Sequence, residues 1–306
     1  MLAFITSLRH PDNSADYARV EALLKGTLMS VTNQTSDDFV VIVVGNKRPA
    51  FVLPEKVHFV PVDFPAPAPP NGPNTEREPF VWDKGTKIGV GLAAAAEFNP
   101  DHVMLFDADD FVSAKLVEFV AAGRKEDVWV VRDGLMYSRR RNVYVLQRDF
   151  NRSCGTSFVV PYTAYGKPAS LTPHATQVEV ADAFGERLNR IMGAHRDAHL
   201  WYFQAGYNVA SVPFTGAVYH VDTGENHSGK SLRGFARPLT RQIETEFGIT
   251  PTRSEAASWV SAYGPVAAYE STLAAIRSFA SRSYRAVFRR PQRKTEPSAV
   301  NGLTRR

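Results

Sequence analysis

The acidic run Asp107-Ala108-Asp109-Asp110 holds the residues of this chain best suited to chemistry. It directly follows residues 103–106, an apolar run with the length of a buried strand. Because three neighbouring carboxylates repel one another, they need a compensating cation, and carboxylate oxygens are ligands that hard divalent ions prefer. Such an ion can neutralise a phosphate group as a Lewis acid. An acidic turn of this kind can instead cap a helix through Asp110 or Ser113, so the surrounding sequence has to decide between the two interpretations.

The composition bounds the size and class of the protein. With 306 residues and 44% hydrophobic content, the chain can form one large α/β domain with an appendage, or two small domains. The net charge of +5 is concentrated at the end, since nine cationic side chains and one acid, Glu296, occur from Arg277 onwards. A nearly neutral body argues against a nucleic-acid-binding core and for a basic tail. The single cysteine, Cys154, excludes an internal disulfide framework and fits a reducing compartment.

Targeting signals are not evident in the sequence. The apolar stretch at residues 1–9 is too short for a signal peptide and lacks a basic flank. No uninterrupted run approaches the ~20 apolar residues of a membrane span. We therefore expect a cytoplasmic protein, with peripheral contact between its basic C-terminus and the inner face of the membrane as an option.

The first half of the chain alternates between strand and helix patterns. Strands are expected at residues 2–7, 39–44, 57–62, 103–106 and 127–132, and helices at residues 17–31, 88–98 and 113–122. Asn13 or Ser14 would cap the first helix. This alternation predicts a doubly wound α/β sheet, in which ligands bind at the carboxyl ends of the strands. Arg9, Asn46 and Asp107 each follow such an end, so we expect them on one rim.

The second half carries a different pattern. A hairpin is expected from residues 135–137 and 143–147. Further strands are expected at residues 158–161, 209–212 and 217–221, and helices at residues 176–192, 196–205, 239–246 and 254–285. The polar, glycine-containing stretch 222–233, which includes Lys230, predicts a loop. Residues from 291 onwards have the composition of a disordered basic tail.

Three segments in a fixed order carry a family resemblance. They are residues 30–46, residues 91–110 with the acidic run, and residues 193–220, which include Gly193-Ala-His-Arg-Asp197 and Val218-Tyr-His220. From about residue 3 to residue 221 the chain resembles the inverting, family-2-like glycosyltransferases of the GT-A fold. Residues 220–228 resemble, more loosely, a rhamnosyltransferase-like subgroup.

The resemblance implies a fold and a division into domains. The expected fold is α/β of the GT-A (nucleotide-diphospho-sugar transferase) type, a mostly parallel doubly wound sheet with a C-terminal helical appendage. Residues 1–235 would form the transferase domain, with a donor-nucleotide half at 1–132 and an acceptor half at 133–235. Residues 236–290 would be C-terminal helices, and residues 291–306 the basic tail.

The activity that the resemblance implies is hexosyl transfer of the kind used in polysaccharide biosynthesis. The donor would be a nucleotide-diphosphate sugar, the cofactor Mn²⁺ or Mg²⁺, and the acceptor a saccharide, glycan or lipid-linked sugar, with inversion at the transferred carbon and no nucleic-acid partner. One alternative is a catalytically degenerate module that binds a nucleotide sugar or glycan. A nucleotidyltransferase is another, although residues 6–16 lack its glycine-rich phosphate loop.

The metal-binding residues follow from the acidic run and the resemblance. Asp109 is expected to coordinate the ion directly, and Asp107 to contact the ion or the ribose. The resemblance makes His220 a further ligand, since imidazole is compatible with manganese. Asp110 would either orient the sugar or cap the next helix.

The general base is expected among two residues. The family usually carries Glu-Asp after the glycine at position 193, whereas this chain has Ala194-His195, with Asp197 two residues on. Asp197 is the acid nearest to the family position, but it would need its pKa raised by burial. The imidazole of His195 titrates near neutrality without such help. Asp197 is the first choice and His195 the second.

Four further residues are candidates for contacts with the donor. Arg9 would stack on the base or hydrogen-bond to it. Asn46 stands where the family usually has a base-binding acid. Lys84 and Lys230 would meet the diphosphate through charge-assisted hydrogen bonds. For the two lysines, a solvated surface position is the simpler alternative.

Overall fold

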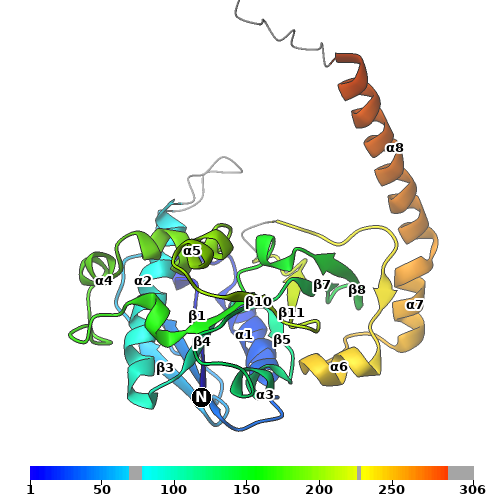
Figure 1. Ribbon diagram of the computed structural model, residues 1–306. Helices are drawn as coiled ribbons and strands as arrows, with labels where there is room; N and C mark the ends of the chain where they lie inside the picture. The colour runs from blue at the N-terminus through cyan, green and yellow to red at the C-terminus, as the bar shows by residue number, and fades with distance from the viewer. Residues whose placement is uncertain (69–77, 226–228, 289–306) are drawn as a thin grey trace, which may run out of the picture.

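A seven-stranded sheet forms the centre of the computed structural model, which describes residues 1–68, 78–225 and 229–288, with side chains as far as Arg277 (Figure 1). The strand order is β10-β6-β9-β4-β1-β2-β3. The strands are β1 (Leu2–Ser7), β2 (Phe39–Gly45), β3 (Val57–Pro61), β4 (His102–Leu105), β6 (Val128–Val130), β9 (Phe158–Pro161) and β10 (Val209–Ser211). All neighbouring pairs are parallel except those of β9 with β4 and β6. The predicted α/β class with a mostly parallel sheet is confirmed.

Helices cover both faces of this sheet. Successive side chains of β1 enter opposite layers, as expected for a strand that is buried on both faces: Phe4 packs in the cluster that contains helix α1 (Tyr17–Val31), and Ile5 in the cluster that contains α2 (Glu78–Ala95). Helix α3 (Leu116–Ala121) lies on the α1 side. The carboxyl ends of β1, β2 and β4 therefore meet at one edge, where Arg9, Asn46 and Asp107 were expected together.

Several helix boundaries differ from the sequence prediction. Helix α2 begins ten residues before the expected start at 88. The added stretch contains Gly85, a residue of low helix propensity, but it is held by close packing, since a Cβ at Gly85 would lie 2.9 Å from Cγ of Leu188. Asp16, rather than Asn13 or Ser14, caps α1, since its side chain accepts the backbone N–H of Arg19 at 3.2 Å.

A second, five-stranded sheet has the order β12-β8-β7-β11-β5. Its strands are β5 (Phe111–Val112), β7 (Asp133–Ser138), β8 (Val143–Arg148), β11 (Ala217–Val221) and β12 (Arg237–Pro238). The predicted hairpin is confirmed as the antiparallel pair β7–β8. Residues 111–112 were expected to lead into a helix, but they pair with β11 instead, so the acidic turn connects the two sheets. The β5–β11 and β6–β10 pairs cross the expected boundary at residue 132, and the domain division stays a prediction.

The remaining helices surround the two sheets. They are α4 (Gln177–Phe184), a π-helical turn (Leu188–Met192), α5 (Ala198–Gln204), α6 (Arg241–Phe247), α7 (Glu255–Tyr263) and α8 (Pro265–Phe288), with short 3-10 turns at Pro11–Asn13, Ala96–Phe98, Phe150–Arg152 and Tyr162–Tyr165. The helix expected at 254–285 is broken at Gly264 and Pro265, since proline lacks the N–H that a continuous helix requires. Among the described helices, none has the length and apolar character needed to cross a membrane. The expected tail at 291–306 lies outside the described residues.

Candidate functional site

The acidic turn is fixed by hydrogen bonds of its own backbone. The N–H of Asp107 donates to Oγ1 of Thr156 at 2.9 Å, and the N–H of Asp110 donates to the carbonyl oxygen of Asp107 at 3.1 Å. The turn begins two residues after β4 ends, so its carboxylates lie at the carboxyl edge of the parallel sheet. This is the edge where such sheets bind ligands.

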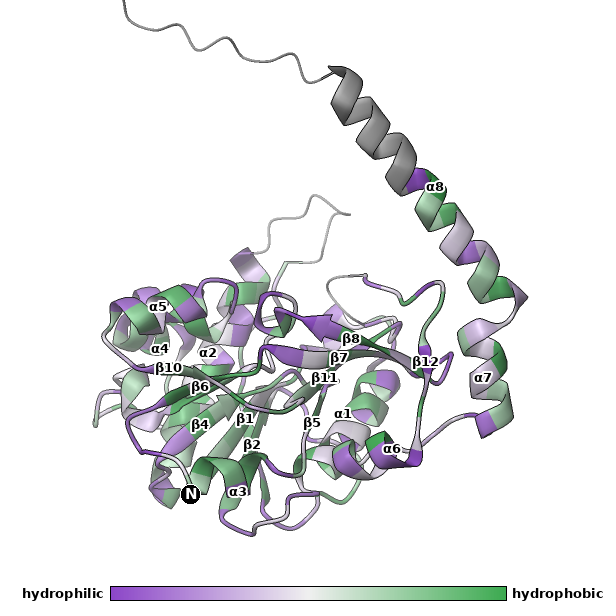
Figure 2. Cartoon of the chain, turned by 45° about the vertical axis from the view of Figure 1, so that its right-hand side comes forward, coloured by the Kyte–Doolittle hydropathy of each residue, from purple (hydrophilic) through white to green (hydrophobic). Residues whose placement is uncertain are grey.

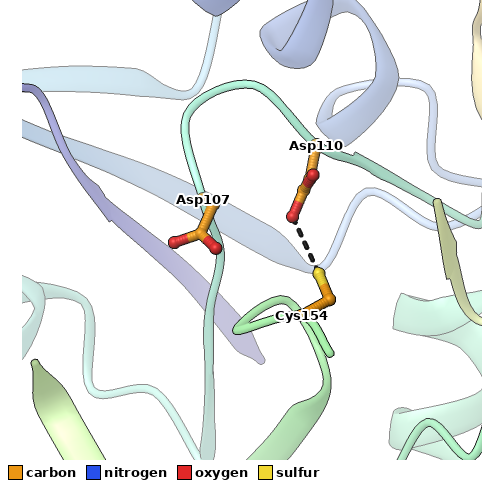
Figure 3. Close-up of side chains that lie close together, drawn as sticks. All are labelled: Asp107, Asp110 and Cys154. Carbon is orange, nitrogen blue, oxygen red and sulfur yellow. Dashed lines mark hydrogen bonds between the residues drawn. The ribbon is translucent and has the colours of Figure 1, made fainter. Parts of the chain in front are cut away.

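Asp110 anchors the turn and is fully buried. Figure 3 shows its carboxylate pointing to the Cys154 thiol. Its Oδ2 accepts hydrogen bonds from Sγ of Cys154 at 2.9 Å and from Oγ1 of Thr156 at 2.6 Å, and its Oδ1 accepts the backbone N–H of His220 at 3.1 Å. Burial, followed by repulsion from Asp109 and Asp107, raises the pKa of Asp110 well above its usual value. These contacts join the turn to the segment before β9 and to β11, so Asp110 holds the turn in position.

Cys154 belongs to the same group but is poorly suited to bind a cation. One ligand atom each from Asp107, Asp110 and Cys154 lie within 4.8 Å of one another. Burial, and then the charge of Asp110, raise the pKa of the Cys154 thiol well above its usual value. Because metals bind the thiolate, this protonated thiol acts as a hydrogen-bond donor to Asp110.

Asp107 is held by a lysine from α2. Nζ of Lys84 donates a hydrogen bond to Oδ1 of Asp107. Burial acts to raise the pKa of Asp107, but the charge and hydrogen bond of Lys84, together with the charge of His195, outweigh it, and the pKa is lowered. For Lys84, Asp107 outweighs the opposite effect of burial and raises the pKa. Both groups are therefore charged near neutrality.

A buried ion pair supports the helix that carries Lys84. Nζ of Lys87 donates to Oδ2 of Asp83 at 2.9 Å and to the carbonyl oxygen of Leu8 at 3.0 Å, and Lys87 has no exposed surface. Leu8 follows the end of β1. The pair thus ties α2 to the same sheet edge and fixes where Lys84 projects.

Asp109 is the third carboxylate of the turn and is only partly buried. Burial, and then repulsion from Asp107, raise its pKa to about 7, against the weaker opposing charges of Lys84 and Arg9. A nearby cation favours the ionised form of a carboxylate. A bound metal ion would therefore favour the ionised form of Asp109 near neutrality.

His195 shares a pocket with Lys84 and Asp107. The pocket lies beyond the end of β4, and its lining includes Leu105, Gly155, Ala198 and Tyr202 in addition to those three. A Cβ at Gly155 would lie 3.0 Å from Oδ2 of Asp107 and 3.4 Å from Nδ1 of His195. The carboxylate and the imidazole therefore both lie against Gly155, where a larger residue would crowd them.

Asp197 occupies a different position. It stands at the N-terminal boundary of α5, is exposed and makes no capping hydrogen bond through its side chain. It is not part of the pocket lining. Of the two candidate bases, the structure brings His195 to Asp107 and leaves Asp197 at the surface.

His220 lies directly behind the acidic turn. Its ring packs between Phe111 and Tyr137, with centroid distances of 5.4 and 5.5 Å, and it hydrogen-bonds to the backbone of Asp109. Burial is the main reason that its pKa is lowered to about 4, so the imidazole is neutral at pH 7. Through its ring and its backbone N–H, His220 positions both Asp109 and Asp110.

The remaining predicted residues lie outside the described pocket lining. Arg9 donates to Oε2 of Glu225 at 2.7 Å and to the carbonyl oxygen of Glu225 at 2.5 Å. Nδ2 of Asn46 donates to the carbonyl oxygen of Phe64 at 2.8 Å, while its buried Oδ1 has no hydrogen-bond partner among the described residues. Nζ of Lys230 lies 5.3 Å from the centre of the Tyr219 ring.

Sequence reasoning missed the segment Cys154-Gly155-Thr156. Cys154 and Thr156 donate hydrogen bonds to Asp110, and Gly155 lies against the side chains of Asp107 and His195. The only sequence signal is a group of small residues ahead of the strand that begins at Phe158. That strand lies antiparallel beside β4, a pairing that the local pattern does not reveal.

Comparisons with known proteins add structural likenesses. No protein-family model matches the chain. No curated protein matches it either. Similar solved structures include S. aureus TarS, at 12% identity and a TM-score of 0.38, with 72% of this chain and 36% of that chain covered. This chain therefore spans about a third of the length of TarS.

Two other structures cover most of their own chains. A manganese complex of Rv0371c from Mycobacterium tuberculosis H37Rv is 16% identical, with a TM-score of 0.35 and coverage of 71% of this chain and 90% of that one. A nucleotide-diphospho-sugar transferase from Desulfovibrio desulfuricans G20 is 10% identical, with a TM-score of 0.32 and coverage of 74% and 88%. Likenesses at this level carry no functional argument, so function has to be judged from the residues of the site. The rhamnosyltransferase-like subgroup stays a prediction.

Proposed function

We propose that this protein is a GT-A-type glycosyltransferase that uses a nucleotide-diphosphate sugar and a divalent cation. The observation that carries the proposal is that a cation, a carboxylate and an imidazole, on Lys84, Asp107 and His195, share one pocket at the carboxyl end of β4. Glycosyl transfer requires that the leaving diphosphate be neutralised, that the acceptor hydroxyl lose its proton and that both substrates be held together. Lys84, and Asp107 through a bound cation, would neutralise the diphosphate, and His195 would accept the proton of the acceptor hydroxyl.

The acidic turn fits a hard divalent ion such as Mn²⁺ or Mg²⁺. Asp107 and Asp109 would supply the oxygen ligands, and a bound cation would oppose the two effects that raise the pKa of Asp109, which are burial and then repulsion from Asp107. Asp110 is engaged by protein donors and would support the two ligands from behind. Ligation by His220 also stays part of the proposal, since its imidazole is neutral at pH 7. When bound, the ion would act as a Lewis acid toward the diphosphate.

The protein's own residues would carry the remaining steps. Lys84 would hydrogen-bond to the diphosphate, with Arg9, whose charge acts on Asp109, as a further cation, and Lys230 as a candidate from the loop after β11. His195, rather than Asp197, would accept the proton of the acceptor hydroxyl. As the acceptor oxygen forms its bond to the anomeric carbon, the bond from that carbon to the diphosphate breaks and the nucleoside diphosphate leaves. A single displacement of this kind inverts the anomeric configuration.

Base recognition would fall to the edge formed by β1 and β2. The buried Oδ1 of Asn46, which lacks a partner among the described residues, is an acceptor that a base N–H would satisfy. The acceptor substrate would be a saccharide, a glycan or a lipid-linked sugar, handled in the cytoplasm.

The experiment that tests the proposal is thermal unfolding with a panel of nucleoside diphosphates, with and without Mn²⁺. A ligand present at 100 times its Kd stabilises the native state by about 2.7 kcal/mol. We expect one diphosphate to raise the Tm of the wild type by several degrees in the presence of Mn²⁺, and Asp109→Ala to abolish the shift. The exposed Asp182 on α4 provides the control, and the Asp182→Ala variant should show the same Tm shift as the wild type.

Two outcomes would oppose the proposal. If no diphosphate shifts the Tm, the acidic turn is a structural connection between the sheets and binds no donor. A metal-dependent shift without release of nucleoside diphosphate from any nucleotide sugar, with or without added saccharides, would indicate a binding module without turnover.

A further inference from the structure

The C-terminal part of the molecule exposes an unusual number of large apolar side chains. Of the fourteen that are exposed among the described residues, seven lie beyond residue 234: Phe235, Trp259, Val260, Tyr263, Val266, Tyr269 and Ile276. We call these seven residues the C-terminal apolar face. Their exposed fractions run from 49% to 72%. Single exposed apolar residues are normal in proteins, but a contiguous group of them indicates an interaction surface.

The aromatic members of this face before α8 are neighbours in space. The ring of Tyr263 lies 5.5 Å from that of Trp259 and 6.4 Å from that of Phe235. On α8, Val266, Tyr269 and Ile276 are spaced by three and seven residues, which places them on one side of the helix. The face therefore runs from the loop before β12 across α7 and along α8.

The other side of α8 is attached to the body. Ala267 is buried, Oε2 of Glu270 accepts the N–H of Gly234 at 2.7 Å, and Oγ of Ser271 accepts the N–H of Phe235 at 2.8 Å. Arg141, which pairs with Glu270 at 3.8 Å, also donates to the carbonyl oxygens of Leu232 and Gly234. Figures 1 and 2 both show α8 leaving the two sheets, so its attachment fixes which side faces outward.

The charge of this region is strongly positive. Residues 265–306 contain nine cationic and two acidic side chains, a net charge of +7 against +5 for the whole chain, so the rest of the protein is slightly acidic. Among the described residues, Arg277 is exposed one position after Ile276, and Arg233 and Arg237 are exposed on either side of Phe235. One of the two acids, Glu270, is already engaged by Arg141.

We infer that the C-terminal apolar face docks on the surface of an anionic lipid bilayer. Tryptophan and tyrosine favour the headgroup level, where their rings are buried and their polar atoms stay hydrated. Cationic residues beside such a face are attracted to anionic lipids. A second copy of the chain is a poorer occupant, since it would bring two ends of charge +7 together. The contact would hold the rest of the molecule close to membrane-borne acceptors.

The test is flotation of the full-length protein with vesicles, without any nucleotide or metal. We expect binding to phosphatidylcholine vesicles that contain phosphatidylglycerol, little binding to pure phosphatidylcholine, and loss of binding as salt increases. The double variant Trp259→Ser/Tyr263→Ser should reduce partitioning at least about tenfold, and Arg277→Glu should reduce it on anionic vesicles only. The control is Leu200→Ser/Phe203→Ser, which removes an exposed apolar pair of α5 and should leave binding unchanged.

Three results would overturn the inference. The first is absence of binding to anionic vesicles, and the second is equal partitioning of the Trp259/Tyr263 variant and the wild type. The third is that light scattering finds a dimer for the wild type and a monomer for this variant, which would assign the face to a second copy. Equal thermal stability of all variants establishes that they are folded. Because no nucleotide is present, failure here leaves the proposed transferase activity untouched.

Discussion

Lys84 and Asp107 form a hydrogen-bonded ion pair at the carboxyl end of β4, and a second such pair, Lys125 with Asp101, lies at the opposite end of the same strand. The pairs share chemistry but differ in surroundings. Hydrogen bonds from Lys125 and the terminal amine lower the pKa of Asp101 to about 2. Asp107 instead shares its turn with two further carboxylates and faces His195. A lysine between acids and a pocket is suited to an anionic ligand, whereas Lys125 makes an exposed surface ion pair with Asp101.

This difference predicts opposite results for two lysine variants. Lys84→Met should weaken binding of the stabilising nucleoside diphosphate at least about tenfold, because it removes a charge-assisted hydrogen bond to phosphate. Lys125→Met should leave that affinity within about twofold. Titration calorimetry measures both. Equal affinities in the two variants would show that Lys84 serves only to hold Asp107.

Substitutions of Asp110 and Asp109 should have opposite effects on the stability of the protein. Asp110→Ala leaves the donors of Cys154, Thr156 and His220 without their shared acceptor, so we expect a loss of about 2–4 kcal/mol in the free energy of unfolding. Asp109→Ala relieves repulsion with Asp107 and should be at least as stable as the wild type without metal. Urea unfolding in the presence of a chelator measures both. A stable Asp110→Ala variant would contradict the anchoring role.

Substitutions of the two candidate bases, His195 and Asp197, should differ in their effect on the reaction rate. His195 lines the pocket and Asp197 does not, so His195→Gln should lower the rate of nucleoside-diphosphate release from the active nucleotide sugar by about 10²–10⁴. Asp197→Asn should change that rate by less than about twofold. Steady-state kinetics measures the rate of each variant. If a variant binds the nucleoside diphosphate as tightly as the wild type, its lower rate reflects catalysis and not binding. The reverse order of effects would restore the acid nearest to the family position as the base.

His102 should make stability depend on pH. It is buried beside Trp129, its Nε2 has no hydrogen-bond partner among the described residues, and burial lowers its pKa below the usual 6.5. Below pH 6.5, His102 is therefore protonated in the unfolded chain while it stays neutral in the native state. The contribution of His102 to the free energy of unfolding is complete above pH 6.5 and is lost as the pH falls. It stops changing below the pKa of His102 in the folded state.

The measurement is the free energy of unfolding of the wild type and His102→Gln between pH 7.5 and 5.5. The difference between the two proteins should shrink as the pH falls, and the exposed His174, as His174→Gln, should show no such trend. A difference that stays constant with pH would mean that His102 titrates normally in the native protein. His102 lies at the end of β4 away from the acidic turn, so bound metal should not disturb the comparison.

The sequence was a reliable guide wherever the signal was local. Runs of apolar residues located every strand of the first sheet, and the longest of them mark β1 and β2, because a strand buried on both faces leaves a continuous hydrophobic stretch. The acidic run located the turn, because its carboxylates are adjacent in the chain. The first ten residues of helix α2 were missed, since Gly85 lowers helix propensity and its packing against Leu188 is not visible in the sequence.

What the sequence determined by itself is the α/β class, the shared rim of the parallel strands, and which residue types could bind a cation or take a proton. Only the tertiary structure decided which of them meet. Asp110 finds its partners 44, 46 and 110 residues away, and His195 rather than Asp197 reaches the pocket. The physical reason is that periodicity and side-chain chemistry are properties of neighbouring residues. Contacts across a site depend instead on how strands such as β9 and β11 pair and on how closely the chain can pack at Gly155.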